Sequence, residues 1–185
     1  MTLPPPLSEE TRRDLLELAR RSLEAAFRGE PPPRLSSDRS EAFGDARALF
    51  VTLKKDGELR GCIGTLSASG DLARMVPVFA RKAAFEDPRF TPLVEEELAR
   101  CVIEISALTA PQLVESAEEV VVGRDGVILE HHGWSGLLLP QVAIEWGFDR
   151  TAFLEAVAQK AGLPPGAWRE EGARLFVFQA EVFGE

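Results

Sequence analysis

The chain has 185 residues, of which 45% are hydrophobic and 28% are charged, and its formal net charge is −9. This size is enough for one substantial hydrophobic core with a smaller lobe beside it. The acidic balance argues against a protein that neutralises a nucleic-acid backbone or docks on anionic lipid. The sequence shows neither a signal-peptide core nor an apolar run of membrane-spanning length. We therefore expect a cytoplasmic protein with no membrane and no nucleic-acid partner.

The first part of the chain predicts a long helix between two irregular segments. Ser8 can cap a helix that runs to about Phe27, over which apolar residues recur at helical spacing, and Gly29 follows its end. Residues 1–7 are predicted to be disordered. Residues 28–47, which are rich in proline and serine, are predicted to form a surface loop.

A hairpin and a second helix are expected next. Residues 48–54 and 59–65 have the composition of strands, and an Asp-Gly pair between them is a hairpin turn signal. Apolar residues at helical spacing then predict a helix over residues 72–83. Pro77 falls inside that pattern, so either the helix kinks there or Pro77 lies near its true start.

The C-terminal half predicts short strands, two helices and a last strand. The strands are expected at residues 98–108, 120–123, 126–130, 136–139 and 174–183, and the helices at 140–146 and 150–161. Hairpin signals outnumber strand–helix–strand units, which favours an α+β fold over a doubly wound parallel sheet. A faint similarity between the two halves, each with an Asp-Gly turn before a strand, does not by itself predict a repeat.

Residues 59–65, with the sequence LRGCIGT, have the composition of a functional site. Alternation along a strand sends Arg60, Cys62 and Gly64 to one face. A guanidinium on the same face is the kind of neighbour that lowers a thiol pKa, and glycines let another group approach the backbone closely. The candidate catalytic residues are Cys62 and Arg60, and the candidate ligand-binding residues of this segment are Gly61, Gly64 and Thr65.

The two cysteines have different interpretations. Free cysteines commonly pack as small buried hydrophobes. An arginine is seldom buried without a partner, so Arg60 on the same face indicates that Cys62 meets water, a cleft or a carboxylate. Cys101 is expected to pack in the core, because Ile103 and Ile105 share its face. We expect both thiols to be reduced.

Polar residues outside residues 59–65 have both ordinary surface interpretations and functional ones. Glu104 lies on the other face of its strand from Cys101, and it is either simply solvated or a third candidate catalytic residue. Asp87 and Arg89 flank a proline and can form a local ion pair or bind a ligand. Gln141 and Glu145 are four residues apart on one helix face and can bind a ligand together, although such pairs are common on ordinary surfaces.

The histidines are His131 and His132, and we expect neither a metal nor a cofactor. Neighbouring residues of a strand point to opposite faces, so the pair cannot bind one metal without a bulge. No His-Glu-x-x-His or Cys-x-x-Cys spacing accompanies it. The chain also lacks a glycine-rich nucleotide loop and a Gly-x-Ser-x-Gly elbow.

Taken together, these segments resemble the AMMECR domain family, and most closely its prokaryotic members, called AmmeMemoRadiSam system protein A. The resemblance rests on the signature LRGCIGT at residues 59–65 and on segments along most of the chain. These are FVTLKKDG at 50–57, AFEDPRF at 84–90, IEIS at 103–106, GLLLPQVA at 136–143, EWGFD at 145–149 and KAGL at 160–163.

The resemblance implies a fold, site residues and partners. The fold is a single α+β domain over residues 1–185, built as two related strand-and-helix repeats around one mostly antiparallel, barrel-like sheet with a smaller lobe. The partners are a Memo-like protein and a radical S-adenosylmethionine protein. The family motifs carry over onto Arg60, Gly61, Cys62, Gly64 and Thr65, and onto Asp87, Arg89 and Phe90.

Two functions fit these observations. In the first, the chain is a cysteine-dependent enzyme or an accessory enzyme component, in which Arg60 activates Cys62 and Glu104, Asp87 or Glu145 carries protons. In the second, it is a non-catalytic binding or scaffold protein that presents the Arg-Gly-Cys-Ile-Gly strand to a partner or a small ligand. We favour the first.

Overall fold

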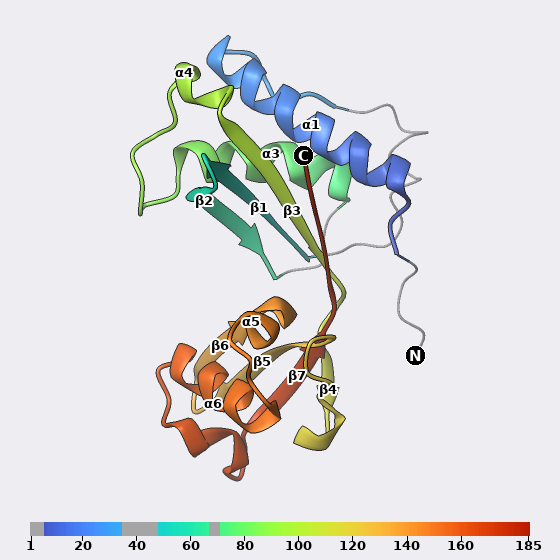
Figure 1. The fold of residues 1–185 in the computed structure, drawn as a ribbon, viewed down its shortest axis with the longest axis vertical. Helices are drawn as coiled ribbons and strands as arrows, with labels where there is room; N and C mark the ends of the chain where they lie inside the picture. The colour runs from blue at the N-terminus through green and yellow to red at the C-terminus, as the bar shows by residue number, and fades with distance from the viewer. Residues whose placement is uncertain (1–5, 35–47, 67–70) are drawn as a thin grey trace. The chain divides into compact units, whose positions relative to one another are not determined.

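The computed structural model describes residues 6–34, 48–66 and 71–185. The chain divides into two compact units, one made of the described residues up to 108 together with 181–185 and the other of residues 109–180 (Figure 1). Each unit has its own sheet and its own hydrophobic core. The two are therefore described separately.

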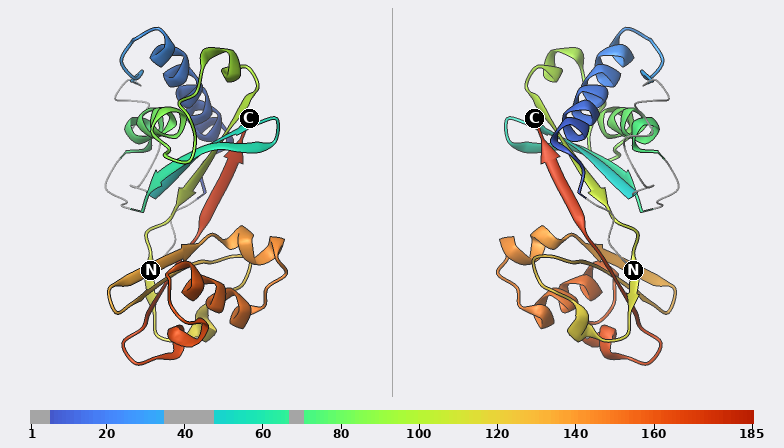
Figure 2. Two further views of the ribbon diagram at one scale, coloured as in Figure 1. Left: turned by 90° about the vertical axis from the view of Figure 1, so that its left-hand side faces the viewer. Right: turned by 90° about the vertical axis from the view of Figure 1, so that its right-hand side faces the viewer.

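The first unit is a sheet with helices on one side. Its strands lie in the order β2-β1-β3-β8, with β1 antiparallel to both β2 and β3. Helices α1 and α3 lie on the same side of this sheet (Figure 2), and the short α4 precedes β3. The bounds are α1 Glu9–Phe27, β1 Ala48–Lys55, β2 Glu58–Thr65, α3 Leu72–Phe85, α4 Glu95–Leu98, β3 Cys101–Leu108 and β8 Ala180–Gly184.

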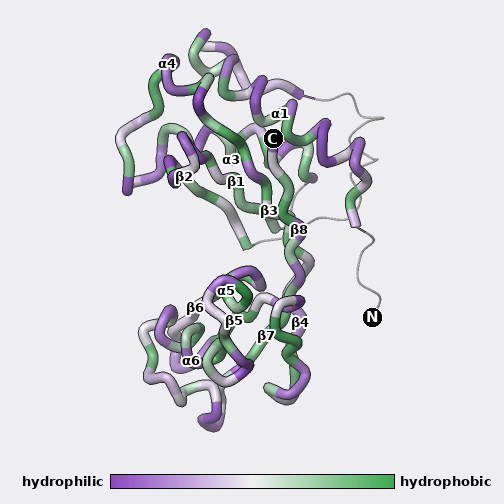
Figure 3. Tube along the Cα trace, viewed as in Figure 1, coloured by the Kyte–Doolittle hydropathy of each residue, from purple (hydrophilic) through white to green (hydrophobic). Residues whose placement is uncertain are grey.

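The helix α1 forms as its sequence predicts. Ser8 caps it by accepting a hydrogen bond from the Thr11 backbone N–H at 3.1 Å. Hydrophobic and hydrophilic residues alternate along it (Figure 3), and Leu15, Leu18 and Leu23 on its inner side are almost fully buried. They pack with residues of α3 and of β1 and β3 in one core.

The second unit repeats this plan with a smaller core. Its strands lie in the order β4-β7-β5-β6, and the pairs that β5 forms with β6 and β7 are antiparallel. Phe153, Leu154 and Val157 of α6 are fully buried in this core with Leu129 of β5. The bounds are β4 Gln112–Val114, β5 Gly126–His131, β6 Trp134–Leu138, α5 Pro140–Glu145, α6 Arg150–Lys160 and β7 Arg174–Phe178, with 3₁₀ turns at Ala117–Glu119 and Pro165–Arg169.

The α+β class and the antiparallel pairing are confirmed, but the sheet is not one barrel. In the described residues it is divided into two four-stranded sheets. The division falls where the chain passes from one sheet to the other: the predicted last strand over 174–183 is broken at Gln179, so β7 joins one sheet and β8 the other. Gln179 pairs with Thr109, since each backbone N–H donates to the other residue at 2.9 Å.

Other differences from the expected elements are local. Residues 98–100 end α4 and do not form the start of β3. The expected strand at 120–123 is wrong, because the Asp125 carboxylate accepts the Val121 N–H at 2.9 Å and holds a turn there. Pro77 lies within α3, whose cap is Asp71. The expectations for residues 1–5 and 35–47 fall outside the described residues.

Among residues 6–34, 48–66 and 71–185, no helix combines the length and the apolar composition that crossing a bilayer requires.

Gly61→Ala should destabilise the first unit. A Cβ at Gly61 would overlap the backbone carbonyl of Ala83, where α3 packs against β2. Overpacking of this kind costs about 1–3 kcal/mol, which urea denaturation followed by circular dichroism measures. Gly166→Ala is the control, because a Cβ at Gly166 would have open space around it and the φ of Gly166 is not in the left-handed region. Equal stability of the two variants would contradict this packing.

Candidate functional site

A β-bulge in β2 decides which signature residues share a face. Leu53 of β1 pairs with Gly61 and Lys54 pairs with Leu59, so Arg60 is an extra residue in β2. Beyond the bulge, Thr52 pairs with Cys62. The expectation that Arg60 and Cys62 share a strand face is therefore wrong, because the bulge breaks the alternation between them.

Arg60 belongs to a separate ionic cluster with Glu97 and Lys55. The Arg60 guanidinium donates to Glu97 at 2.8 Å and to the Thr91 carbonyl at 2.9 Å, and the Lys55 ammonium binds the same carboxylate at 2.6 Å. Hydrogen bonds from Arg60 and then Lys55 lower the pKa of Glu97 to about 2, and the Glu97 carboxylate raises the pKa of Arg60. Arg60 is thus a structural cation that ties β2 to α4.

Cys62 lies in a polar row that crosses three strands. It is half-buried, and its sulfur accepts a hydrogen bond from the Thr52 hydroxyl at 3.2 Å. On the far side of Thr52, the paired residue of β3 is Glu104, whose carboxylate binds the Lys54 ammonium at 2.8 Å. Side chains directly opposite each other in an antiparallel pair point to the same face. The sheet therefore brings together a thiol, a hydroxyl and a carboxylate.

Asp87 and Arg89 fix the backbone of Cys62. The Asp87 carboxylate accepts the Cys62 backbone N–H at 2.8 Å, and Arg89 reaches the Cys62 carbonyl at 3.3 Å. Arg89 also donates two side-chain hydrogen bonds to Asp87, at 2.9 and 2.6 Å. β2 is an edge strand of its sheet, so this pair satisfies backbone groups that an edge leaves open. The Asp-Pro-Arg loop holds the signature strand in place.

The electrostatics of Asp87 follow from its surroundings. Its side chain is 3% exposed, whereas that of Arg89 is 55% exposed. Hydrogen bonds from Arg89 and from the Cys62 N–H hold the pKa of Asp87 well below its ordinary value, against the opposing effect of burial. Asp87 is therefore ionised over the whole physiological range, and it keeps Arg89 beside Cys62.

At Gly61 and Gly64 of the signature, the space that a side chain would need is occupied by other parts of the protein. A Cβ at Gly61 would overlap Ala83 of α3, and one at Gly64 would overlap the Leu49 carbonyl and the Phe50 ring. Thr65 pairs with Leu49 at the end of β2. Close approach to these glycines is thus explained by packing of the chain on itself.

The remaining candidates lie elsewhere. Cys101 is buried in the core of the first unit, as expected. Gln141 and Glu145 lie on α5 in the second unit, where Glu145 is exposed. The buried Gln141 Oε1 has no hydrogen-bond partner within the described part of the chain.

The histidine pair differs from its expected geometry. His132 has φ +49° and Gly133 has φ +80°, so they form the tight turn between β5 and β6. The expectation that the two side chains point to opposite faces is wrong, because His132 is not extended. The two imidazole rings lie 3.8 Å apart between centroids.

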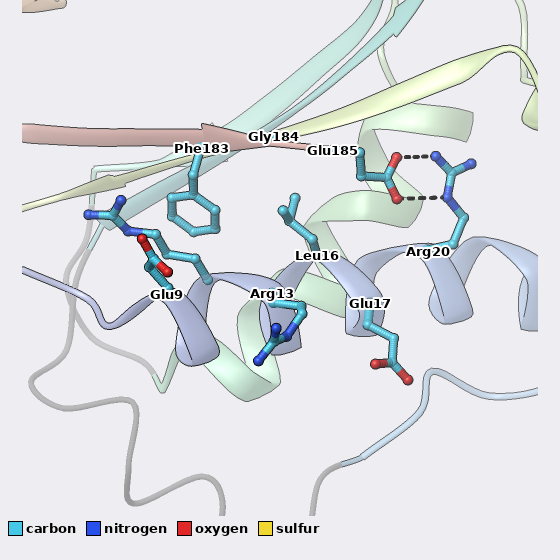
Figure 4. A pocket seen from close by; sticks show the side chains of 9 residues that line it. Glu9, Arg13, Leu16, Glu17, Arg20, Phe183, Gly184 and Glu185 are labelled. Atoms are coloured by element: carbon cyan, nitrogen blue, oxygen red, sulfur yellow. Dashed lines mark hydrogen bonds and ion pairs between the residues drawn. The ribbon is translucent and has the colours of Figure 1, made fainter.

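A hollow on the helix side of the first unit was not foreseen. It has a volume of about 570 Å³ and lies between α1 and β8 (Figure 4). Leu16 and Phe183 form its apolar part, while Arg20 pairs with Glu185 at one end. Cys62 is not among its lining residues. Its residues come from segments distant in sequence, so no local pattern signals it.

Comparisons with known proteins agree with this fold. The AMMECR1 family model matches residues 16–183. A protein of Methanothermobacter thermautotrophicus is 43% identical over 97% of this chain and 97% of its own length. A protein of Pyrococcus furiosus is 40% identical over 97% of this chain and 90% of its own length. The crystal structure of the uncharacterised protein PH0010 from Pyrococcus horikoshii has a TM-score of 0.86 at 37% identity, covering 97% of this chain and 93% of that one.

Asp87→Asn should lower the free energy of unfolding at pH 7 by about 2 kcal/mol, the size expected for hydrogen bonds to a charged group. The folded pKa of Asp87 lies below its ordinary value of 3.8, so its stabilisation is complete above that value and is lost as the pH falls through the folded pKa. The stability gap between wild type and variant should therefore narrow below about pH 4.

Urea denaturation at pH 7, 4 and 3 measures this gap. Glu58→Gln on the same strand is the control, because Glu58 is exposed. A gap that stays constant from pH 7 to pH 3 would contradict the role assigned to Asp87.

Arg60→Gln should leave the rate at which Cys62 reacts with iodoacetamide unchanged, because the guanidinium lies in the Glu97 cluster. Peptide mass spectrometry separates adducts on Cys62 from those on Cys101. Lys55→Gln is the matched control, since it weakens the same cluster from β1. A slower reaction in Arg60→Gln with no change in Lys55→Gln would restore Arg60 as the activator of Cys62.

Proposed function

Since the chain belongs to the AMMECR1 family, we propose that its signature cysteine takes part in chemistry performed with a Memo-like protein and a radical S-adenosylmethionine protein. In this proposal the chain is a cysteine-dependent enzyme or an enzyme component of the cytoplasm. Cys62 is its nucleophile or its substrate-tethering thiol. The observation that supports this most is the hydrogen bond of 3.2 Å from the Thr52 hydroxyl to the Cys62 sulfur.

The surroundings of Cys62 are consistent with a reactive group held in one position. Its backbone N–H and carbonyl are bound by Asp87 and Arg89, and its sulfur accepts from Thr52. A site held at both backbone and side chain is pre-organised for reaction. A buried structural cysteine such as Cys101 instead lies among aliphatic side chains.

The roles of the neighbouring groups follow from the row. The Thr52 hydroxyl donates to the Cys62 sulfur and so fixes the direction in which the side chain points. Glu104, one strand beyond Thr52, supplies a carboxylate that can accept a proton from a group bound over the row. Lys54 keeps Glu104 in position through their ion pair. Arg60 has no part in this arrangement.

The alternative is the non-catalytic scaffold that presents the signature strand to a partner or small ligand. In this alternative, Gly61 and Gly64 allow the backbone of a partner to approach the strand closely. Packing of α3 and β1 onto Gly61 and Gly64 accounts for those glycines without a ligand. The hydrogen bond from the Thr52 hydroxyl holds the Cys62 sulfur itself in position. A reactive thiol needs such positioning, whereas a strand that only presents its backbone does not, so we favour the cysteine-dependent function.

Thr52→Val should slow the alkylation of Cys62 by iodoacetamide about fivefold, because the hydroxyl that positions the sulfur is lost, and with it a net hydrogen bond of about 1 kcal/mol. Valine keeps the shape of threonine, and Thr91→Val, at an exposed position of the same unit, is the control. The rates are measured on native protein by mass spectrometry. Equal rates in wild type and Thr52→Val would contradict a reactive site built around Cys62.

Co-expression separates the two functions. We expect tagged chain to capture a Memo-like protein and a radical S-adenosylmethionine protein from a genome that encodes all three, at low salt and at high salt. Cys62→Ser should retain this capture but lose any covalent adduct on residue 62 in intact-mass spectra. Loss of capture in Cys62→Ser would favour the scaffold, and no capture of either protein by the wild type would contradict the proposed partners.

A further inference from the structure

The turn between β5 and β6 gathers two imidazoles in the second unit. β5 ends at His131, and the positive φ of His132 turns its side chain back beside that of His131. The His131 side chain is only 2% exposed, so its ring has a fixed position. His132 is exposed and can adjust.

A carboxylate meets the buried imidazole. Glu170, which follows the 3₁₀ turn at Pro165–Arg169, places a carboxylate oxygen 3.0 Å from His131 Nε2. One ligand atom from each of His131, His132 and Glu170 lies within 4.8 Å of the other two. His131 and His132 are neighbours in the sequence, whereas Glu170 lies far from them and is brought beside them by the fold.

We propose that His131, His132 and Glu170 bind one divalent transition-metal ion of the zinc class. Two imidazole nitrogens and one carboxylate oxygen are a ligand set that Zn²⁺ takes in proteins, with a fourth position left for water or a substrate atom. Imidazole favours zinc and its transition-metal neighbours over Mg²⁺ and Ca²⁺, which prefer oxygen ligands throughout. All three residues belong to residues 109–180, whereas Cys62 belongs to the other unit.

The distances suit such an ion after a small adjustment. Ligand atoms about 2.0–2.2 Å from one Zn²⁺ lie about 3.4 Å apart at a tetrahedral angle. The 3.0 Å between His131 and Glu170 is already close to that value, and the spread of 4.8 Å closes when the exposed side chains move. His131 is the anchor, while Glu170, which is 54% exposed, and His132 close on the ion.

Neighbouring cations leave Glu170 available. Arg174 is paired with Glu130, and Arg169 lies 3.9 Å from the Glu155 carboxylate and over the Trp168 ring. Glu170 instead interacts with His131. The competing interpretation is a simple His131–Glu170 hydrogen bond, in which His132 has no role.

Zinc titration of the full chain tests the site. Isothermal titration calorimetry of chelator-treated protein with zinc chloride should give one equivalent per chain. His132→Asn and Glu170→Gln should each weaken binding by at least ~10-fold, as loss of groups in a metal site does. Asparagine tolerates the positive φ of residue 132. Glu171→Gln, at the adjacent exposed carboxylate, is the control and should bind as the wild type does.

Cobalt(II) distinguishes this site from the thiols. Co²⁺ bound by His131, His132 and Glu170 should give visible bands without the near-ultraviolet thiolate-to-cobalt band, and both variants should lose them. Equal zinc affinity in wild type and His132→Asn would reduce the cluster to a hydrogen bond between His131 and Glu170 and would overturn the proposal. A thiolate band, or no binding of zinc or cobalt by the wild type, would overturn it as well.

Discussion

The interaction on which the candidate site depends is the one between the Asp87 carboxylate and the backbone N–H of Cys62. An edge strand has free N–H and C=O groups along its open side, and each must find a partner or remain in water. Here Asp87 takes the N–H and Arg89 reaches the C=O, while Arg89 also neutralises Asp87. The loop that carries Asp87 and Arg89 thus bonds the open backbone groups of Cys62 and fixes the strand. It binds only the backbone, so it leaves the cysteine side chain to interact with Thr52.

The bulge at Arg60 gives this arrangement its chemistry. Counted from the two-residue turn at Asp56 and Gly57, an unbroken hairpin would pair Thr52 with Gly61. The extra residue shifts the register by one, so that Thr52 lies opposite Cys62 and donates to its sulfur. It also sends Arg60 to Glu97. A single inserted residue therefore replaces a thiol–guanidinium pair with a thiol–hydroxyl pair.

Much of the fold could be predicted from the sequence because the signals are local. The Ser8 cap, the apolar stripe of α1 and the Asp-Gly turn each act within a few residues. The resemblance of residues 59–65 and the other motifs to the AMMECR family is confirmed. The break at Gln179 could not be predicted, since strands on both sides of it alternate equally well and only their partners, β5 and β3, differ.

The candidate site could be predicted only in part. Four predicted residues have side chains typical of functional sites, and the structure places all four at or around the pair of Thr52 and Cys62. Glu104 is placed by the sheet, and Asp87 and Arg89 by the adjoining loop. Thr52 and Lys54 were missed, because a threonine and a lysine in a strand are ordinary until the register is known. The histidine pair differs from its prediction for a related reason: strand alternation ends at His131, and His132 lies in a turn with a positive φ.

Hydrogen exchange at the Cys62 amide tests the central claim most directly. If Asp87 binds that N–H, the amide should exchange slowly although it lies on the open edge of β2, and it should exchange rapidly in Asp87→Asn while the amides of β1 and β3 stay protected. Rapid exchange of the Cys62 amide in the wild-type protein would show that the loop does not hold the strand, and the site described around Cys62 would lose its foundation.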